Sequence, residues 1–135
     1  MTSDEDQVVE IIAAWEHAVQ QRDMDGTLAN HAAELVMFDV PEPIQARGLD
    51  EYRETWELFF HYSRGGPASF RLHELALFVG TDVAFAHALL DVADVHCRVT
   101  LGLRKADDRW LIIHEHHSSP WPDPRENPEL AALND

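Results

Sequence analysis

Apolar residues recur at helical spacing in the first third of the chain. Over residues 3–22 they lie three and four positions apart, which predicts an amphipathic helix. Ser3 followed by Asp6 resembles a capping box with Asp in place of Glu, so the helix should begin there. A short second helix is predicted over 25–33, and a brief strand over 35–39. Pro41 ends that strand, because proline cannot donate to a ladder.

A third helix is predicted after Gly48, and an aromatic stripe marks its apolar face. The stripe consists of Tyr52, Trp56, Phe59 and Phe60. Near Gly65 the period of the pattern changes from helical to two, as in half-buried strands. Four strands are predicted beyond that point, over residues 70–79, 83–92, 95–104 and 109–118.

Helices followed by a meander of long strands predict an α+β fold. We expect three N-terminal helices to pack on one face of a curved antiparallel sheet, closing a cone around one apolar pocket. A chain of 135 residues suits a single domain. This domain should span residues 1–120, with a proline-rich tail over 121–135.

The charge balance is strongly acidic, with 25 Asp and Glu against 10 Lys and Arg. A formal charge of -15 repels phosphate backbones and anionic lipid, so neither nucleic acid nor membrane is an expected partner. Cys97 is the single cysteine and is interpreted as a small core residue. The polar, acidic start of the chain is unlike a signal peptide, and no apolar run is long enough to span a bilayer. A cytoplasmic location is expected.

Four stretches of the chain carry a family resemblance by their order and spacing. They are RDMDG (22–26), VMFDVPEP (36–43), QARGLDEYRETWELFF (45–60) and RVTLGLRKADDRWLIIHEHHSSP (98–120). In these stretches the chain resembles the SnoaL-like and ketosteroid-isomerase-like members of the NTF2-like superfamily. The resemblance implies a conical α+β fold with a pocket, but not one activity, because such folds host many chemistries.

Carried over residue by residue, the resemblance places Asp39 where the isomerase keeps its general base. Trp15 falls where that enzyme has an oxyanion-hole tyrosine, and Thr100 about where it has a protonated aspartic acid. The base position is kept and both oxyanion donors are lost, so steroid isomerase activity is not expected. The expected pocket lining is Trp15, Tyr52, Trp56, Phe60, Phe85, Thr100, Ile113, Glu115 and His117.

Five residues are the candidates for catalysis: Asp39, His87, Arg98, His114 and His116. A pocket carboxylate at Asp39 would be partly desolvated and therefore a better base, whereas a turn aspartate would bond to local backbone N–H groups. His87 shares a strand face with Phe85, either in the pocket or as a hydrogen-bonded core residue. Arg98 either pairs with a carboxylate inside or faces solvent or a partner subunit, because an unpaired buried charge is costly.

The run His114-Glu115-His116-His117 alternates across its strand, so two of its side chains must face one way and two the other. The resemblance sends Ile113, Glu115 and His117 inward. A three-residue turn over 106–108 would instead bring His114 beside Thr100 and His116 near Arg98, and both registers stay open. Two histidines at this spacing can also hold a transition metal, although no bound metal is expected.

Three functions compete on these observations. The first is a cofactor-independent isomerase, cyclase or lyase that transfers protons near a carbonyl of a small apolar or aromatic ligand. The second is a non-catalytic ligand-binding or dimerisation module, and the third is a metal-dependent enzyme using His114 and His116. A homodimer is expected through the outer face of the sheet, which should carry the apolar residues Val95, Cys97, Val99 and Leu101.

Overall fold

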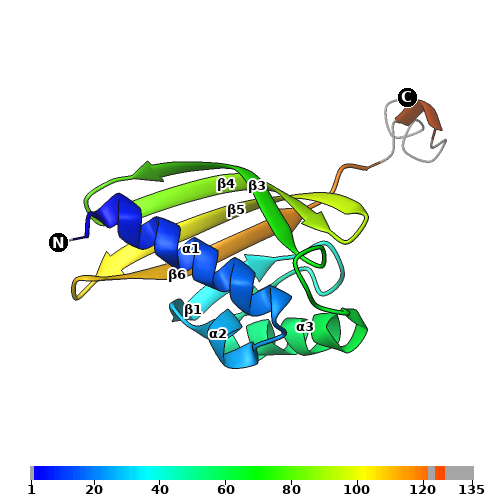
Figure 1. Cartoon of the computed structure of the whole chain (residues 1–135), viewed down its shortest axis with the longest axis horizontal. Coiled ribbons are helices and arrows are strands. Elements are labelled where there is room, and N and C mark those ends of the chain that lie inside the picture. Colours follow the sequence, from blue (N-terminus) through cyan, green and yellow to red (C-terminus); the bar gives the residue numbers. More distant parts are fainter. Residues whose placement is uncertain (1, 122–123, 127–135) are drawn as a thin grey trace.

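The computed structural model describes residues 2–121 and 124–126. Its helices are α1 (Asp4–Gln20), α2 (Met24–Leu28) and α3 (Gly48–Tyr62), with a short 3-10 turn, η1 (Pro124–Glu126). Its strands are β1 (His31–Phe38), β2 (Ala46–Arg47), β3 (Arg71–Val79), β4 (Val83–Val92), β5 (Val95–Ala106) and β6 (Arg109–Ser118). They form one sheet in the order β2-β1-β6-β5-β4-β3, and α1 runs across one face of it (Figure 1). The four long strands and the three helices expected from the hydrophobic pattern are therefore present.

The sheet is mixed, so the prediction of an antiparallel sheet is wrong at one pair of strands. β1 runs parallel to β6, with Met37 opposite Glu115, while every other pair is antiparallel. Hairpins fix the directions of β3 to β6, but most of the chain separates β1 from β6, and no local signal sets its direction. The second helix was predicted to extend to residue 33, but α2 ends at Leu28. Strand β1 begins at His31, inside the stretch predicted to be helical.

Helix α1 begins where the sequence predicts, and its buried stripe faces the sheet. The Ser3 hydroxyl accepts a hydrogen bond from the backbone N–H of Asp6 at 3.1 Å, which satisfies one of the free donors at the helix start. Ile12 and Trp15 are each 1% exposed and belong to the main core together with residues of the sheet. The helix thus supplies one wall of the interior in which the polar residues described below are held.

Buried and exposed residues alternate along β4 and β5 as predicted, but the residues expected on the inner face lie on the outer face. On β4 the alanines 84, 86 and 88 are buried while Phe85 and His87 are exposed. On β5 Val99 and Leu101 are buried, and the outer face carries the polar residues of that strand. The family resemblance places Phe85 and His87 on the inner face, but small alanines lie there, where Trp15 and other bulky side chains fill the same core.

The outward and inward faces of β5 also differ from those expected for the dimer surface. Val99 and Leu101 lie in the core and Cys97 is half-buried, so of the four residues proposed for the outer face only Val95 is exposed.

No helix within residues 2–121 and 124–126 is long and apolar enough to cross a membrane. The predicted tail over 121–135 lies mostly outside the described residues, which include only Trp121 and the turn η1 from that stretch.

The hydrogen bond at the start of α1 gives a direct test of the fold. Ser3→Ala should lower the free energy of unfolding by about 1 kcal/mol, because the N–H of Asp6 loses its acceptor. Urea denaturation measures this difference, and Ser3→Asp, which restores an acceptor, serves as the matched control. Equal stability of Ser3→Ala and the wild type would contradict the cap.

Candidate functional site

A β-bulge in β6 places the central residues of the site. The register with β5 shifts between the pairs Gly102–His114 and Leu103–Ile112, so one extra residue, Ile113, enters the strand. Ile112 and Glu115 therefore both face the interior although they are three positions apart. Ile113 itself is half-buried rather than a full member of the inner face.

Beyond the bulge, Glu115 is completely buried and its carboxylate receives three side-chain hydrogen bonds. Oε2 lies 2.5 Å from Nε2 of His31 and accepts from the hydroxyl of Tyr52 at 2.6 Å. Oε1 lies 2.8 Å from Nε2 of His117, two residues along the same strand. A buried carboxylate needs such partners, because an isolated charge in the interior would cost many kcal/mol.

A second set of hydrogen bonds holds these partners in place. Nδ1 of His31 donates to the backbone carbonyl of Ala29 at 2.9 Å, just before β1 begins. The Tyr52 hydroxyl from α3 accepts from Nε1 of Trp15 on α1 at 3.1 Å. Residues from α1, α3, β1 and β6 thus converge on Glu115, and we call His31, Tyr52, Glu115 and His117 the buried cluster.

The protonation of the buried cluster follows from these contacts. Burial alone would raise the pKa of Glu115, but the hydrogen bonds from His117 and His31 and their charges hold it well below its usual range. Burial and the neighbouring carboxylate raise the pKa of Tyr52, which therefore stays protonated. Burial would lower the pKa of His117, but its hydrogen bond to Glu115 and the charges of Glu115 and Asp39 raise it overall.

His117 is the member of the buried cluster nearest to solvent. Its side chain is 8% exposed, and its Nδ1 makes no hydrogen bond within the part of the chain that the structure describes. The rings of Trp15 and Trp56 lie 6.0 and 6.4 Å from the imidazole, centroid to centroid. Trp56 also carries a buried indole N–H that lies near the Tyr52 hydroxyl but has no hydrogen-bond partner among the described residues. Nδ1 of His117 and Nε1 of Trp56, both without a partner among the described residues, therefore lie beside the buried cluster.

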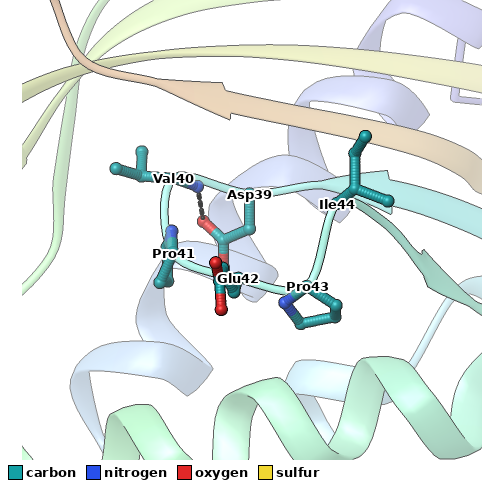
Figure 2. A pocket seen from close by; sticks show the side chains of 6 residues that line it. All are labelled: Asp39, Val40, Pro41, Glu42, Pro43 and Ile44. Carbon is teal, nitrogen blue, oxygen red and sulfur yellow. Dashed lines mark hydrogen bonds between the residues drawn. The ribbon is translucent and has the colours of Figure 1, made fainter.

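Asp39 lies at the rim of this region, just after β1. It is half-buried, and its carboxylate accepts a hydrogen bond from the backbone N–H of Val40 at 2.8 Å, which Figure 2 shows as the dashed line. This is the contact expected of a turn aspartate. The same carboxylate is close enough to His117 to raise the pKa of its imidazole. The loop from Asp39 to Ile44 lines an open hollow on the surface (Figure 2). No residue of the buried cluster lines this hollow.

The structure places the other predicted site residues in two groups. The first group lies in the interior and either belongs to the buried cluster or lies next to it. It consists of Trp15, Tyr52, Trp56, Phe60, Glu115 and His117. The expectation that the remaining residues face the pocket is wrong, because the phase of β4 and β5 and the bulge of β6 turn them outward. The outward-facing residues are Phe85, His87, Arg98, Thr100, His114 and His116.

Contacts of these outward residues differ from those expected. Arg98 donates to the Ser118 hydroxyl at 3.2 Å and does not pair with a buried carboxylate. Phe38 packs between the rings of His114 and His116, whose centroids are 6.3 Å apart. Within residues 2–121 and 124–126 no group of three or more His, Cys, Asp or Glu side chains is arranged to hold a metal ion.

His31 was not recognised in the sequence, because the stretch around it was predicted to be helical. The available signal was the run from His31 to Phe38, in which apolar residues lead into Asp39 without a helical period. Its pairing with Glu115 spans 84 positions of sequence, so only the parallel β1–β6 contact brings the two residues together.

The fold and the inward-facing polar cluster define the class, a conical α+β domain with a cystatin-like arrangement of sheet and helices. The family model described as "SnoaL-like domain" matches residues 8–122. The chain therefore belongs to the SnoaL-like family of the NTF2-like superfamily. Among curated proteins no sequence matches.

Solved structures with the same fold support this assignment. An NTF2-like protein of unknown function from Pseudomonas putida shares 29% identity with a TM-score of 0.81, over 94% of this chain and 95% of that one. A proposed dehydratase of the NTF2-like family from Streptomyces avermitilis shares 16% identity with a TM-score of 0.74, over 88% and 97%. A proposed ketosteroid isomerase from Parabacteroides distasonis shares 17% identity with a TM-score of 0.70, over 89% and 90%. The last two show the fold alone.

The low pKa of Glu115 predicts how stability depends on pH. Its ionised form stabilises the folded state above the ordinary value of 4.5, and this contribution is lost as the pH falls toward the folded-state value near 2. Glu115→Gln should cost about 3–5 kcal/mol at pH 7, because His31, Tyr52 and His117 lose the charged acceptor of their buried hydrogen bonds. It should also remove part of the loss of stability in acid.

Denaturant unfolding of both proteins from pH 7 to pH 3 measures this difference. The exposed Glu57→Gln provides the control, because Glu57 forms only a surface pair with Arg53. A Glu115→Gln protein as stable as the wild type at pH 7 would show that the carboxylate is not ionised in the core.

Proposed function

We propose that this protein is a cofactor-independent isomerase, cyclase or lyase whose general base is His117. The observation that supports this most strongly is the different surroundings of the two ring nitrogens of His117. Nε2 of His117 is held by the buried carboxylate of Glu115 at 2.8 Å, while Nδ1 makes no hydrogen bond to any residue that the structure describes. A carboxylate that fixes the orientation and tautomer of a histidine leaves the opposite nitrogen as the proton acceptor.

The chemistry follows from that arrangement. Nδ1 of His117 would remove a proton from the carbon next to a carbonyl group, and the C–H electron pair would move onto the carbonyl oxygen. The indole N–H of Trp56, a buried donor with no partner among the described residues, is suited to stabilise that oxygen. Return of the proton to another carbon gives an isomerase. Its transfer to a departing hydroxide gives water and a dehydratase.

The aromatic side chains around His117 favour a small, flat and uncharged ligand. Aromatic side chains of Trp56, Phe59, Phe60 and Phe70 pack against one another beside His117. Asp39 at the rim and a formal charge of -15 disfavour anions. An aromatic or unsaturated carbonyl compound fits both conditions. The names of two solved relatives, a proposed dehydratase and a proposed ketosteroid isomerase, agree with this class of reaction.

A second function, a non-catalytic binding or dimerisation module, is favoured by the filling of the core. Trp15, Trp56, Phe60 and Phe70 are each at most 8% exposed and occupy the space between the helices and the sheet. The two hollows that stand out are open depressions on the surface, and neither includes His117. A ligand would therefore reach His117 only if part of this aromatic packing moved aside.

Exchange of carbon-bound hydrogen for deuterium tests the proposed enzyme without a known substrate. A panel of unsaturated ketones and β-hydroxyketones is incubated with the protein in D2O, and proton NMR follows exchange or loss of water. His117→Gln should lower the rate of any catalysed exchange by at least about 100-fold, since the base is removed.

His116→Gln is the matched control, because His116 lies on the same strand and faces outward. Its rate should equal that of the wild type. Equal rates in the wild type and His117→Gln, or no exchange with any compound, would favour the binding module.

We also propose that the protein forms a homodimer through the outer face of the sheet. The support lies in exposed aromatic residues on β3 and β4, at one edge of the sheet. Phe78 and Phe85 are 52% and 48% exposed, and their rings stack on each other at 4.7 Å. Leu89 and Phe38 are exposed on the same sheet. A stacked pair of large aromatic side chains exposed to solvent is a feature of interaction surfaces, and this pair supports an interface on β3 and β4.

Light scattering of Phe85→Lys tests this surface. The wild type should be a dimer at micromolar concentration, and the variant should be a monomer, because two buried lysines would repel each other across a symmetric interface. Leu58→Lys, on the exposed side of α3, should leave the dimer intact. A monomeric wild type would contradict the proposal.

A further inference from the structure

We propose that residues 63–69, which connect α3 to β3, form the gate through which a ligand reaches His117, and that Gln20 and Arg22 at the end of α1 hold this gate closed. We call residues 63–69 the connecting segment. The inference rests on the proposed function, because a ligand can use His117 only when the aromatic packing beside it opens. It concerns the entry to that site and applies to a binding module as well as to an enzyme.

Phe70, the residue directly after the connecting segment, covers the rings that flank His117. Its ring lies 5.2 Å from that of Trp15 and 5.8 Å from that of Trp56, centroid to centroid. These are the two indoles that pack beside the His117 imidazole. Phe70 is 1% exposed, so it fills the interior at this point. A movement of the connecting segment that carries Phe70 outward would therefore open space beside both indoles.

The connecting segment is built to change its conformation. None of residues 63–69 is buried, so its own side chains add little apolar packing to hold it in place. Gly65 and Gly66 have φ angles of 74° and 89°, in the left-handed region that glycine enters readily. At Gly66 no atom beyond its chain neighbours lies within 4 Å of the place that a Cβ would take. Such a segment can change its backbone angles while the helix and the strand on either side keep theirs.

The end of α1 holds the connecting segment by hydrogen bonds. A guanidinium N–H of Arg22 donates to the backbone carbonyl of Phe60 at 2.8 Å, and the side-chain amide of Gln20 donates to that of Phe70 at 2.7 Å. The backbone carbonyl of Gln20 also accepts from the N–H of Gly66 at 2.8 Å. Each such bond adds only modest net stability, so these contacts can break while the core stays folded.

The chain is anchored on both sides of the segment. Beyond Phe70, the backbone N–H of Leu72 donates to a carboxylate oxygen of Glu16 at 2.6 Å, and Leu72 pairs with Leu90 in the sheet. Before the segment, the N–H of Ser63 closes the last turn of α3. Movement is therefore confined to the connecting segment and to Phe70 at its end.

The loop over residues 39–44 also lies near the site, but it adds no ring to the cover of His117. Val40 and Ile44 are 54% and 92% exposed. A movement of this loop would leave Phe70 in contact with both indoles. The connecting segment is therefore the entry that the contacts favour.

Proton exchange of the Trp56 indole with water, followed by NMR in the full-length protein, tests the gate. This N–H is buried and has no hydrogen-bond partner among the described residues, so access of water controls its exchange. Gln20→Leu removes the bond to Phe70 at similar side-chain size, and exchange should become about fivefold faster or more. Arg22→Gln, which removes the bond to Phe60, should act in the same direction.

Two controls separate opening of the gate from a general loss of stability. Exchange of the Trp110 indole, which donates to Asp4 at the other end of α1, should be unchanged in Gln20→Leu. Gln21→Leu changes the neighbouring, exposed glutamine and should leave both indoles as in the wild type. Unchanged exchange of Trp56 in Gln20→Leu, equal acceleration of Trp56 and Trp110, or equal acceleration in Gln21→Leu would overturn the inference.

The deuterium exchange of carbon-bound hydrogen separates this inference from the proposed function. Faster indole exchange in Gln20→Leu without any catalysed exchange in the wild type would leave the gate standing and refute the enzyme. Where catalysis occurs, its rate at low compound concentration should rise in Gln20→Leu by the same factor, because the open fraction sets the apparent affinity. A rate that stays unchanged while the indole exchanges faster would refute the gate alone.

Discussion

The ionised carboxylate of Glu115 is the constraint on which the interior of this protein depends. A fully buried negative charge is tolerated only when donors from several elements surround it, and here they come from β1, α3 and β6. The parallel pairing of β1 with β6, the bulge at Ile113 and the position of Tyr52 on α3 all serve to bring these donors together. The order and direction of the strands therefore determine which donors reach the carboxylate, and the buried carboxylate in turn stabilises this arrangement of strands.

Sequence patterns predicted the elements well, because hydrophobic period and turn residues are local properties. They failed where the outcome depended on contacts between distant segments. On β4 the family resemblance places Phe85 and Leu89 on the inner face, but the alanines between them lie inside, where bulky side chains from the helices need the space. Alternation shows that a strand has two faces, and only the packing partner decides which face is buried.

The bulge in β6 explains why the inward residues of the histidine run could not be derived from turn geometry. The extra residue Ile113 reverses the phase within one strand, so the two halves of β6 follow different registers against β5. The family resemblance placed Glu115 and His117 inward, as the structure does. His31 was missed, since its role arises only from the pairing of β1 with β6.

The chain belongs to the SnoaL-like family, whose match gives the domain and not the function, so the proposed chemistry rests on the buried cluster. A histidine fixed by a carboxylate on one nitrogen and free on the other is suited to proton transfer. The tight aromatic packing beside it requires that ligands enter by displacing side chains. Catalysis and ligand binding therefore share the same physical requirement, which is movement of the aromatic wall near Trp56 and Phe60.

The ionisation of Glu115 is the central claim, and carbon-13 NMR of its side-chain carboxyl group measures it most directly. The signal is identified by its absence in Glu115→Gln. The hydrogen bonds of the buried cluster predict an ionised carboxylate at pH 7 that stays ionised when the pH falls below 4.5, where exposed glutamates take up protons. A carboxyl group that is protonated at pH 7, or that titrates together with the exposed glutamates, would contradict it.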